Sequence, residues 1–250
     1  MKTEIPRDRF GRPLVIPRDG GRAVPYRRCT TFIDVLADQY QLQQWKQRQV
    51  ALGLAARADL LLKAAAAAGD KKTLNAVCEA AMEAAGSSAS ATIGTALHAL
   101  TEQLDRGETP AIPASAEADI AAYRAATGFW TMADIEVFVV NDALQVAGTF
   151  DRVVAAGHLR FIADLKTGGI DYAASKIAMQ LAVYANSERY DPETGARSSL
   201  DVNQERGLVI HLPAGEGRCS FHWADLKAGW EGVQLAAQVW AWRARKGLLV

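Results

Sequence analysis

A chain of 250 residues is long enough for one sizeable domain with elaborations and too short for two large domains. Half of the residues are hydrophobic and 22% are charged, a composition that excludes a globally disordered protein. Lysine and arginine together number 28, as do aspartate and glutamate, so the net charge by itself does not indicate a nucleic-acid partner.

The sequence gives no sign of a membrane or secreted protein. No stretch reaches the ~18 uninterrupted apolar residues of a membrane span. The start, MKTEIPRDRFGRP, lacks the apolar segment that a secretory signal carries behind its charges. Cys29, Cys78 and Cys219 are scattered and odd in number, which predicts reduced core thiols and neither a disulfide framework nor a zinc site. We therefore expect a cytoplasmic protein without a membrane partner.

The charges are distributed unevenly along the chain. Residues 1–28 carry eight basic side chains against three acidic ones, and residues 101–119 carry five acidic side chains against Arg106 alone. This distribution fits a basic surface that binds a polyanion beside an acidic pocket that binds a metal ion. Ordinary surface variation explains it equally well, so charge alone does not decide the function.

The amino-terminal third is expected to be a basic segment followed by helices. The first thirty residues are rich in arginine, proline and glycine, which predicts a loop or short hairpin that ends in a helix cap at Thr30–Thr31. From Phe32 to about Ala85, apolar residues recur at three- and four-residue spacing, with a break at Gly69–Asp70. We therefore expect residues 1–88 to form a basic segment and helical extension, and residues 89–250 to form a core.

The remainder alternates between helical and strand patterns. Helices are expected at Ser90–Arg106 and Ser115–Thr131, before the period changes to that of strands. In chain order we then expect strands Ile135–Val140, Leu144–Val154 and Leu159–Lys166, a helix Tyr172–Tyr190, strands Gly207–Leu212 and Arg218–Trp223, and a helix that ends near Lys246. The predicted fold class is α/β (α+β), with a mixed central β-sheet flanked by helices and a helical amino-terminal extension.

The third predicted strand, FIADLKTGG, carries a polar pair at its end. Because side chains alternate across a sheet, Asp164 and Lys166 lie on one face and Leu165 on the other. A carboxylate and an amine at the end of an apolar strand suit the rim of a cleft. Taken alone, the pair suits a structural ion pair as well.

The second predicted strand adds a carboxylate, Asp151, to an otherwise apolar run. If the two strands pair antiparallel through Gly157, Asp151 and Asp164 can face each other. Two close carboxylates raise each other's pKa unless a cation lies between them, and Mg²⁺ or Mn²⁺ suits such oxygen ligands. A bound metal would lower the pKa of a water molecule and neutralise a phosphate, while Lys166 could position or deprotonate that water.

Two predicted helices each carry a polar pair at four-residue spacing. His98 and Glu102 share one helix face, and a neutral imidazole there could complete a metal shell. Gln180 and Tyr184 form the second pair, on an otherwise apolar helix. Both pairs also suit ordinary positions at a helix surface.

Four short motifs stand in an order that resembles the RecB-type branch of the PD-(D/E)XK nucleases and the related exonucleases of actinobacteriophages. They are Gly-Thr-x-x-His at 94–98, Gly-Thr-Phe-Asp-Arg at 148–152, Asp-Leu-Lys-Thr-Gly at 164–168 and Gln-Leu-x-x-Tyr at 180–184. The resemblance covers roughly residues 90–190, and its specificity comes from the order and spacing of the motifs.

This resemblance implies a restriction-endonuclease-like core and a Mg²⁺- or Mn²⁺-dependent deoxyribonuclease. It favours an exonuclease acting at DNA ends in phage or bacterial recombination or replication, in the host cytoplasm if the chain is phage-encoded. By the same resemblance the metal ligands would be His98, Asp151, Asp164 and the carbonyl of Leu165. Lys166 would be the catalytic amine, and Gln180 and Tyr184 would support the site or touch DNA. Glu136 stands where family members often place an acidic residue, and Glu102 is a further candidate acid.

The chain also departs from some branches of that family. Members with an iron–sulfur cluster need four cysteines, one early and three late, whereas only Cys219 is late here, so no cluster is expected. No phosphate-binding loop of the Walker type is present, so a helicase or recombinase partner would be a separate chain. Ring-shaped homo-oligomers occur among related phage exonucleases, but nothing in the sequence requires one.

Two further interpretations remain beside the nuclease. A non-cutting module that binds DNA or a protein partner could share the fold, although the complete set of Asp151, Asp164 and Lys166 favours an enzyme. A purely structural helical protein fits poorly with carboxylates on adjacent apolar strands. The candidate DNA-binding residues, which combine cations with an aromatic ring, are Arg27, Arg28, Trp45, Arg48 and Arg152. Trp45 also suits simple packing between helices.

Overall fold

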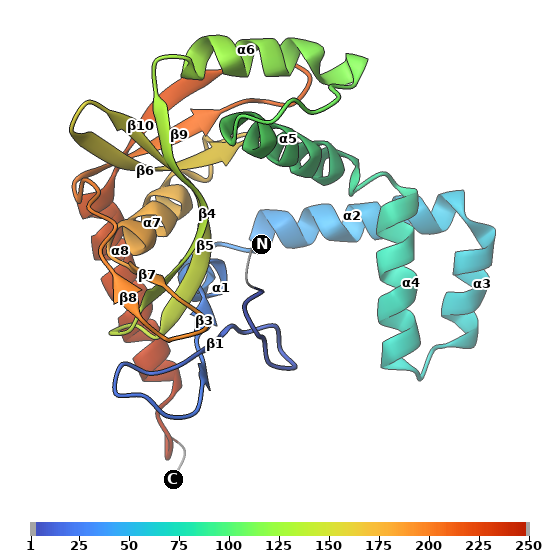
Figure 1. Ribbon diagram of the computed structural model, residues 1–250. Coiled ribbons are helices and arrows are strands. Elements are labelled where there is room, and N and C mark those ends of the chain that lie inside the picture. Colours follow the sequence, from blue (N-terminus) through green and yellow to red (C-terminus); the bar gives the residue numbers. More distant parts are fainter. Residues whose placement is uncertain (1–3, 249–250) are drawn as a thin grey trace. The chain divides into compact units, whose positions relative to one another are not determined.

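The computed structural model describes residues 4–248, and these form two compact units (Figure 1). The sheet unit contains the described residues up to Ala37 and those from Leu97 onward, and the helical unit is Asp38–Ala96. This division differs from the boundary expected after residue 88. The amino-terminal segment belongs with the sheet because its strand β3 (Arg27–Arg28) pairs with the core strand β5 (Val146–Ala156).

Three helices make up most of the helical unit: α2 (Tyr40–Ala56), α3 (Ala58–Ala66) and α4 (Lys71–Ala84). Leu60, Val77 and Ala81 form its small buried cluster. Asp70 caps α4 by accepting hydrogen bonds from the backbone of Lys72 and Thr73, which confirms the predicted break before this helix. The unit is therefore held by a modest apolar core and a defined cap.

The sheet unit is built on an eight-stranded mixed sheet in the order β10-β9-β6-β5-β4-β7-β8, with β3 beside β5. Its other strands are β4 (Thr131–Asn141), β6 (Leu159–Lys166), β7 (Glu188–Tyr190), β8 (Arg197–Ser198), β9 (Arg206–His211) and β10 (Ser220–Asp225). The meander β4-β5-β6 is antiparallel, as predicted, whereas β6 and β9 run parallel. A separate short hairpin joins β1 (Leu14–Val15) to β2 (Val24–Pro25), which is one of the two alternatives expected for this segment.

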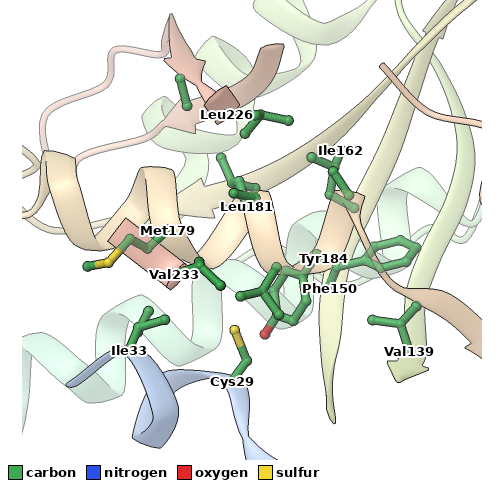
Figure 2. Close-up of a cluster of buried hydrophobic side chains, with 14 of the residues drawn as sticks. Cys29, Ile33, Val139, Phe150, Ile162, Met179, Leu181, Tyr184, Leu226 and Val233 are labelled. Carbon is green, nitrogen blue, oxygen red and sulfur yellow. The ribbon is translucent and has the colours of Figure 1, made fainter. Parts of the chain in front are cut away.

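Helices cover both faces of the sheet. The first face carries α7 (Ala174–Ala185), with α1 (Cys29–Ile33) and α8 (Leu226–Arg243) packed against it. In this layer Leu181 of α7 lies in one buried cluster with Phe150 and Ile162 of the sheet (Figure 2). On the opposite face, α6 (Glu117–Thr127) places Tyr123 against Phe161 and Leu165. The remaining helices are α5 (Ala89–Asp105) and the short 3₁₀ turns η1 (Asp34–Leu36) and η2 (Ala114–Ala116). The predicted α/β class with a mixed central sheet flanked by helices is confirmed.

Several predicted boundaries were wrong. The helix expected to reach Tyr190 ends at Ala185, because Glu188–Tyr190 leaves the helical path and pairs with β4 as β7. The first helix begins at Cys29, before the expected cap at Thr30–Thr31, and its N-cap residue makes no capping hydrogen bond through its side chain. Non-local pairing decides the first of these differences.

The three cysteines differ in their exposure. Cys29 is buried and Cys219 half-buried, but Cys78 is exposed on α4, so the prediction of three core thiols was wrong for Cys78. Within residues 4–248, no helix combines the length and the apolar character that a membrane crossing requires.

Candidate active site

Strand β5 changes partners along one edge, and this change creates a fork in the sheet. Residues 152–156 pair with β6, and residues 146–147 pair with β3. Between these pairings, residues 148–151 have no strand partner on that edge within the described chain. The last β5–β6 pair is Arg152 with Ala163, after which β6 continues beside β9. Asp151 and Asp164 therefore stand where the two strands separate, one position beyond the ladder in which they were expected to face each other.

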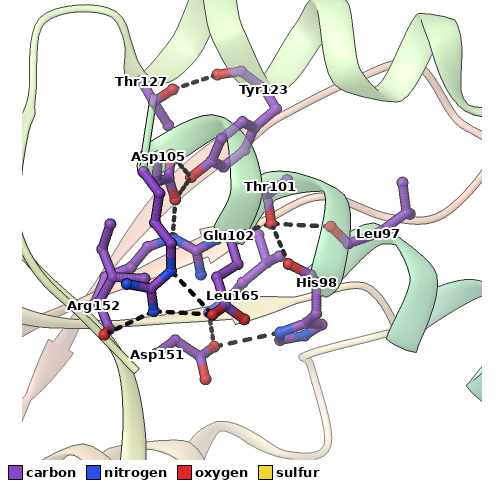
Figure 3. A network of polar contacts seen from close by, with 12 residues as sticks. Leu97, His98, Thr101, Glu102, Asp105, Tyr123, Thr127, Asp151, Arg152 and Leu165 are labelled. Atoms are coloured by element: carbon purple, nitrogen blue, oxygen red, sulfur yellow. Dashed lines mark hydrogen bonds and ion pairs between the residues drawn. The ribbon is translucent and has the colours of Figure 1, made fainter. Parts of the chain in front are cut away.

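Asp151 occupies the opening of the fork. Its Oδ2 accepts a hydrogen bond from the backbone N–H of Leu165 at 2.8 Å and lies 3.6 Å from Nδ1 of His98 (Figure 3). The carboxylate thus satisfies an N–H group that lies just beyond the end of the β5–β6 ladder. Helix α5 brings the imidazole to the same point, as the motif order predicted.

The pairing of β5 with its other neighbour, β4, is also irregular next to Asp151. The β4–β5 ladder passes from Ile135–Arg152 to Val137–Phe150 and skips Glu136, whose φ is 53°. A non-glycine residue in the left-handed region is uncommon and often marks a functional position. Glu136 lines a cavity of about 410 Å³ together with Phe138 and Thr149, and a role for it in the site stays a prediction.

Asp164, Lys166 and Gln180 form a closed polar cluster. The ammonium of Lys166 pairs with Oδ2 of Asp164, and it donates to Oε1 of Gln180 at 3.4 Å. The amide of Gln180 donates in turn to Oδ1 of Asp164, also at 3.4 Å. The predicted alternation is confirmed, since Asp164 and Lys166 face α7 while Leu165 packs in the cluster on the opposite face. The ion pair that the sequence offered as an alternative therefore exists within the candidate site.

Tyr184 lies on α7, one helical turn after Gln180. It is buried in the core, with its ring centroid 6.4 Å from that of Phe150. A Cβ atom added at Gly148 would come within 2.9 Å of the tyrosine ring, so β5 and α7 approach closely only because residue 148 is glycine. Tyr184 is only 4% exposed, which leaves little of its side chain available to DNA, and its implied support of the site stays a prediction.

Arg152 corrects one DNA-binding prediction. Its side chain is only 1% exposed, and it donates to the carboxylate of Asp105 and to Oγ of Thr101 (Figure 3). Tyr123 donates to the same carboxylate at 2.7 Å. The guanidinium is therefore used inside the protein, where it fastens α5 to β5 one residue from Asp151. The only sequence signal for this network was the four-residue spacing of Thr101 and Asp105 on one helix face.

The other candidate DNA-binding residues come from both units of the chain. Arg27 is half-buried, with its guanidinium carbon 4.4 Å from the centre of the Trp240 ring, and Arg28 is exposed beside it. Trp45 and Arg48 are exposed on α2 in the helical unit. Arg27 and Arg28 therefore belong to the sheet unit, whereas Trp45 and Arg48 belong to the helical unit.

The two helix-face pairs behave differently from each other. Glu102 forms an ion pair with Arg106 at 2.9 Å, one turn along α5, while His98 turns toward Asp151. Gln180 and Tyr184 both lie on the side of α7 that faces β5 and β6. In the second pair Gln180 contacts Lys166 and Asp164 while Tyr184 packs near Phe150, and in the first pair His98 makes the contact with Asp151.

Burial and charge give the site unusual acid–base properties. Burial, with a further contribution from the negative charge of Asp151, raises the pKa of Asp164 to about 7, while Lys166 opposes the rise. Burial also lowers the pKa of His98, against the attraction of Asp151. His98 is therefore neutral near pH 7, the form in which imidazole binds metals.

The residues fit a divalent cation by chemistry and charge. In the described part of the chain, no three His, Cys, Asp or Glu side chains are already arranged as a metal-binding group. The buried carboxylate of Asp164, whose ionised form is disfavoured, and the nearby carboxylate of Asp151 nevertheless provide negative charge that a cation would stabilise. Two carboxylates, one neutral imidazole and the carbonyl of Leu165 suit Mg²⁺ or Mn²⁺.

Comparison with known proteins gave no match, either to a protein-family model or to a curated protein sequence.

Proposed function

We propose that this chain is a divalent-metal-dependent deoxyribonuclease with a core of the PD-(D/E)XK type. The observation that carries the proposal is the meeting of Asp151, Asp164 and Lys166 at a fork between two strands of a mixed sheet. The site is partly open, since the side chains of Lys166 and Asp151 are 28% and 16% exposed. The amine of Lys166 and the carboxylate of Asp151 are therefore accessible to a phosphate group, while Asp164 lies buried behind them.

The ligands for Mg²⁺ or Mn²⁺ would be Asp151, Asp164, the imidazole of His98 and the carbonyl oxygen of Leu165. When bound, the ion supplies a lowered pKa for its water molecule and neutralises charge on the phosphate. Asp151 already accepts the N–H of Leu165, which holds this carboxylate close to the strand that carries Asp164.

Lys166 would exchange partners during the reaction. A carboxylate that binds a cation no longer needs the ammonium as its counter-ion, so Lys166 becomes available to position or deprotonate the attacking water. Gln180 keeps the amine at the site, because its Oε1 accepts from Nζ of Lys166 while its amide donates to Asp164. The buried contact of Arg152 with Asp105 holds α5, and with it His98, against β5.

We extend the proposal to an exonuclease that acts on DNA ends, with any helicase or recombinase as a separate chain. End-labelled linear DNA and closed circular DNA, incubated with Mg²⁺, Mn²⁺ or EDTA, test this proposal. Degradation of linear DNA alone, in the presence of metal, is the expected result. Cleavage of circles as well would make the protein an endonuclease. Binding without cleavage would support the non-cutting module, and the absence of both would overturn the proposal.

A further inference from the structure

An arginine-rich turn near the amino terminus holds an exposed aromatic ring between two cations. Phe10, at the tip of this turn, is 64% exposed. The guanidinium carbons of Arg9 and Arg12 lie 4.7 and 5.5 Å from the centre of its ring. We call residues 7–13 the arginine turn.

Hydrogen bonds give the arginine turn a defined conformation. The carboxylate of Asp8 accepts from the backbone N–H groups of Phe10 and Arg12, each at 2.9 Å, and from Nε of Arg12 at 2.8 Å. Arg7 and Pro13 form a β-bridge at its base, and the buried Pro13 accepts a backbone hydrogen bond from Tyr26. The turn is therefore anchored to the sheet unit.

This conformation brings like charges together at a solvent-exposed position. Three arginines of the turn, Arg7, Arg9 and Arg12, stand against the single carboxylate of Asp8, a local surplus of two positive charges. Asp8 pairs with Arg12, and no ion pair of Arg9 occurs in the described part of the chain. Guanidinium groups bind phosphate oxygens through paired N–H donors, and an aromatic ring can hold such groups in place. The cluster thus has the chemistry of a site for phosphate groups.

We propose that the arginine turn binds the sugar–phosphate backbone of the substrate DNA. This inference rests on the proposed nuclease function and names a contact surface for it. The turn belongs to the same compact unit as the fork. Ile5, two residues before the turn, lines the cavity that also contains Glu136 and Thr149, and Thr149 precedes Asp151 by two residues on β5. A DNA strand that leaves the fork along this side of β5 passes toward the turn.

Two variants separate the roles of charge and of the aromatic ring. Arg9→Ala removes one phosphate contact, so the slope of log affinity against log salt should fall by about 0.9 for duplex DNA and about 0.7 for a single strand. Phe10→Ala leaves the charge unchanged, yet it should weaken binding by about two- to fivefold, because the two guanidinium groups lose the cation–π contact with the ring. Phe10→Tyr should restore the parental affinity. Arg245→Ala, which removes an exposed arginine after the end of α8, is the matched control and should bind like the parent.

Fluorescence anisotropy with labelled duplex and single-stranded oligonucleotides, in EDTA and at several salt concentrations, measures these affinities. Thermal melting of each variant checks that it is folded. If the parent protein neither binds nor cuts DNA, the proposed function itself fails. If the parent binds DNA and both Arg9→Ala and Phe10→Ala bind equally well, only the arginine turn is refuted. Loss of binding to polyglutamate, with DNA binding intact, would assign the turn to an acidic protein partner and also overturn the proposal.

Discussion

Asp164 combines complete burial with a titratable group, and this combination predicts a pH dependence of stability. Its pKa is raised to about 7 in the folded protein, whereas an unfolded chain has about 3.9. The folded state therefore binds more protons between these values, so the contribution of Asp164 to stability is present below about pH 4 and is lost as pH rises toward 7.

Replacement of Asp164 by asparagine should remove this dependence. Urea unfolding of the parent and Asp164→Asn proteins, in EDTA between pH 4.5 and 8, gives the difference in unfolding free energy. The parent should lose stability relative to the variant as pH increases, because only the parent must ionise a buried carboxyl group. Parallel curves across this range would contradict the role given to burial at Asp164.

Lys166→Ala separates metal binding from catalysis at the same site. Removal of the ammonium takes a positive charge away from Asp164, so Mn²⁺ binding measured by calorimetry should be retained or tightened. Cleavage should slow by about 10²–10⁴-fold, the usual effect of losing a positioned acid–base group. Lys176→Ala is a matched control, because Lys176 pairs with Asp34 away from the cluster. If Lys166→Ala cleaves DNA at the parental rate, Lys166 is not a catalytic residue.

At the scale of elements, the site depends on the close approach of β5 and α7 at Gly148. A methyl group at this position would meet the ring of Tyr184 at 2.9 Å and Cβ of Cys29 at 3.3 Å. Gly148→Ala should therefore destabilise the protein by about 1–3 kcal/mol, the usual cost of overpacking. It should also slow cleavage, since Tyr184 lies on the helix that carries Gln180. Thr149→Ala, on the exposed neighbouring residue, is the control in urea unfolding, and equal stability of the two variants would disprove the packing argument.

The sequence predicted the strands of the meander, because β-branched runs and turns are local signals. It also predicted that Asp164 and Lys166 share a face, since alternation is a property of one strand. The fork could not be predicted in the same way. On the edge of β5 that faces β6, residues 146–147 pair with β3, and this pairing joins segments that lie far apart in the sequence. Arg152 was misassigned for the same reason, since its partner Asp105 lies 47 residues away.

For the whole molecule, the division into two units was beyond the reach of the sequence pattern. Helix α5 runs without interruption from Ala89 to Asp105, while the division falls between Ala96 and Leu97. Gly94 lies three residues before Leu97, but it does not interrupt the helix, and neither a proline nor a cap marks the point of division. The boundary was expected after residue 88 because Gly86, Ser87 and Ser88 interrupt the helical pattern before α5 begins.

The two units have separate apolar clusters, so damage to one should leave the other intact. A side chain at Gly53 of α2 would overlap the carbonyl of Ala81 on α4, which means that Gly53→Ala must force these helices apart. Hydrogen exchange should then show lost protection in α2, α3 and α4 and unchanged protection in β5 and β6. Loss of protection in β5 and β6 as well would show that the units unfold together. Gly69→Ala, where added atoms meet open space, is the control.

The central claim is that the fork is a metal-dependent active centre for DNA cleavage. A cleavage time course on linear DNA should compare the parent, Asp164→Ala and the exposed-carboxylate control Glu216→Ala, each with Mn²⁺ and with EDTA. We predict that the parent and Glu216→Ala degrade the DNA only with metal, and that folded Asp164→Ala does not degrade it. Cleavage by Asp164→Ala at the parental rate, or parental cleavage that persists in EDTA, would contradict the claim.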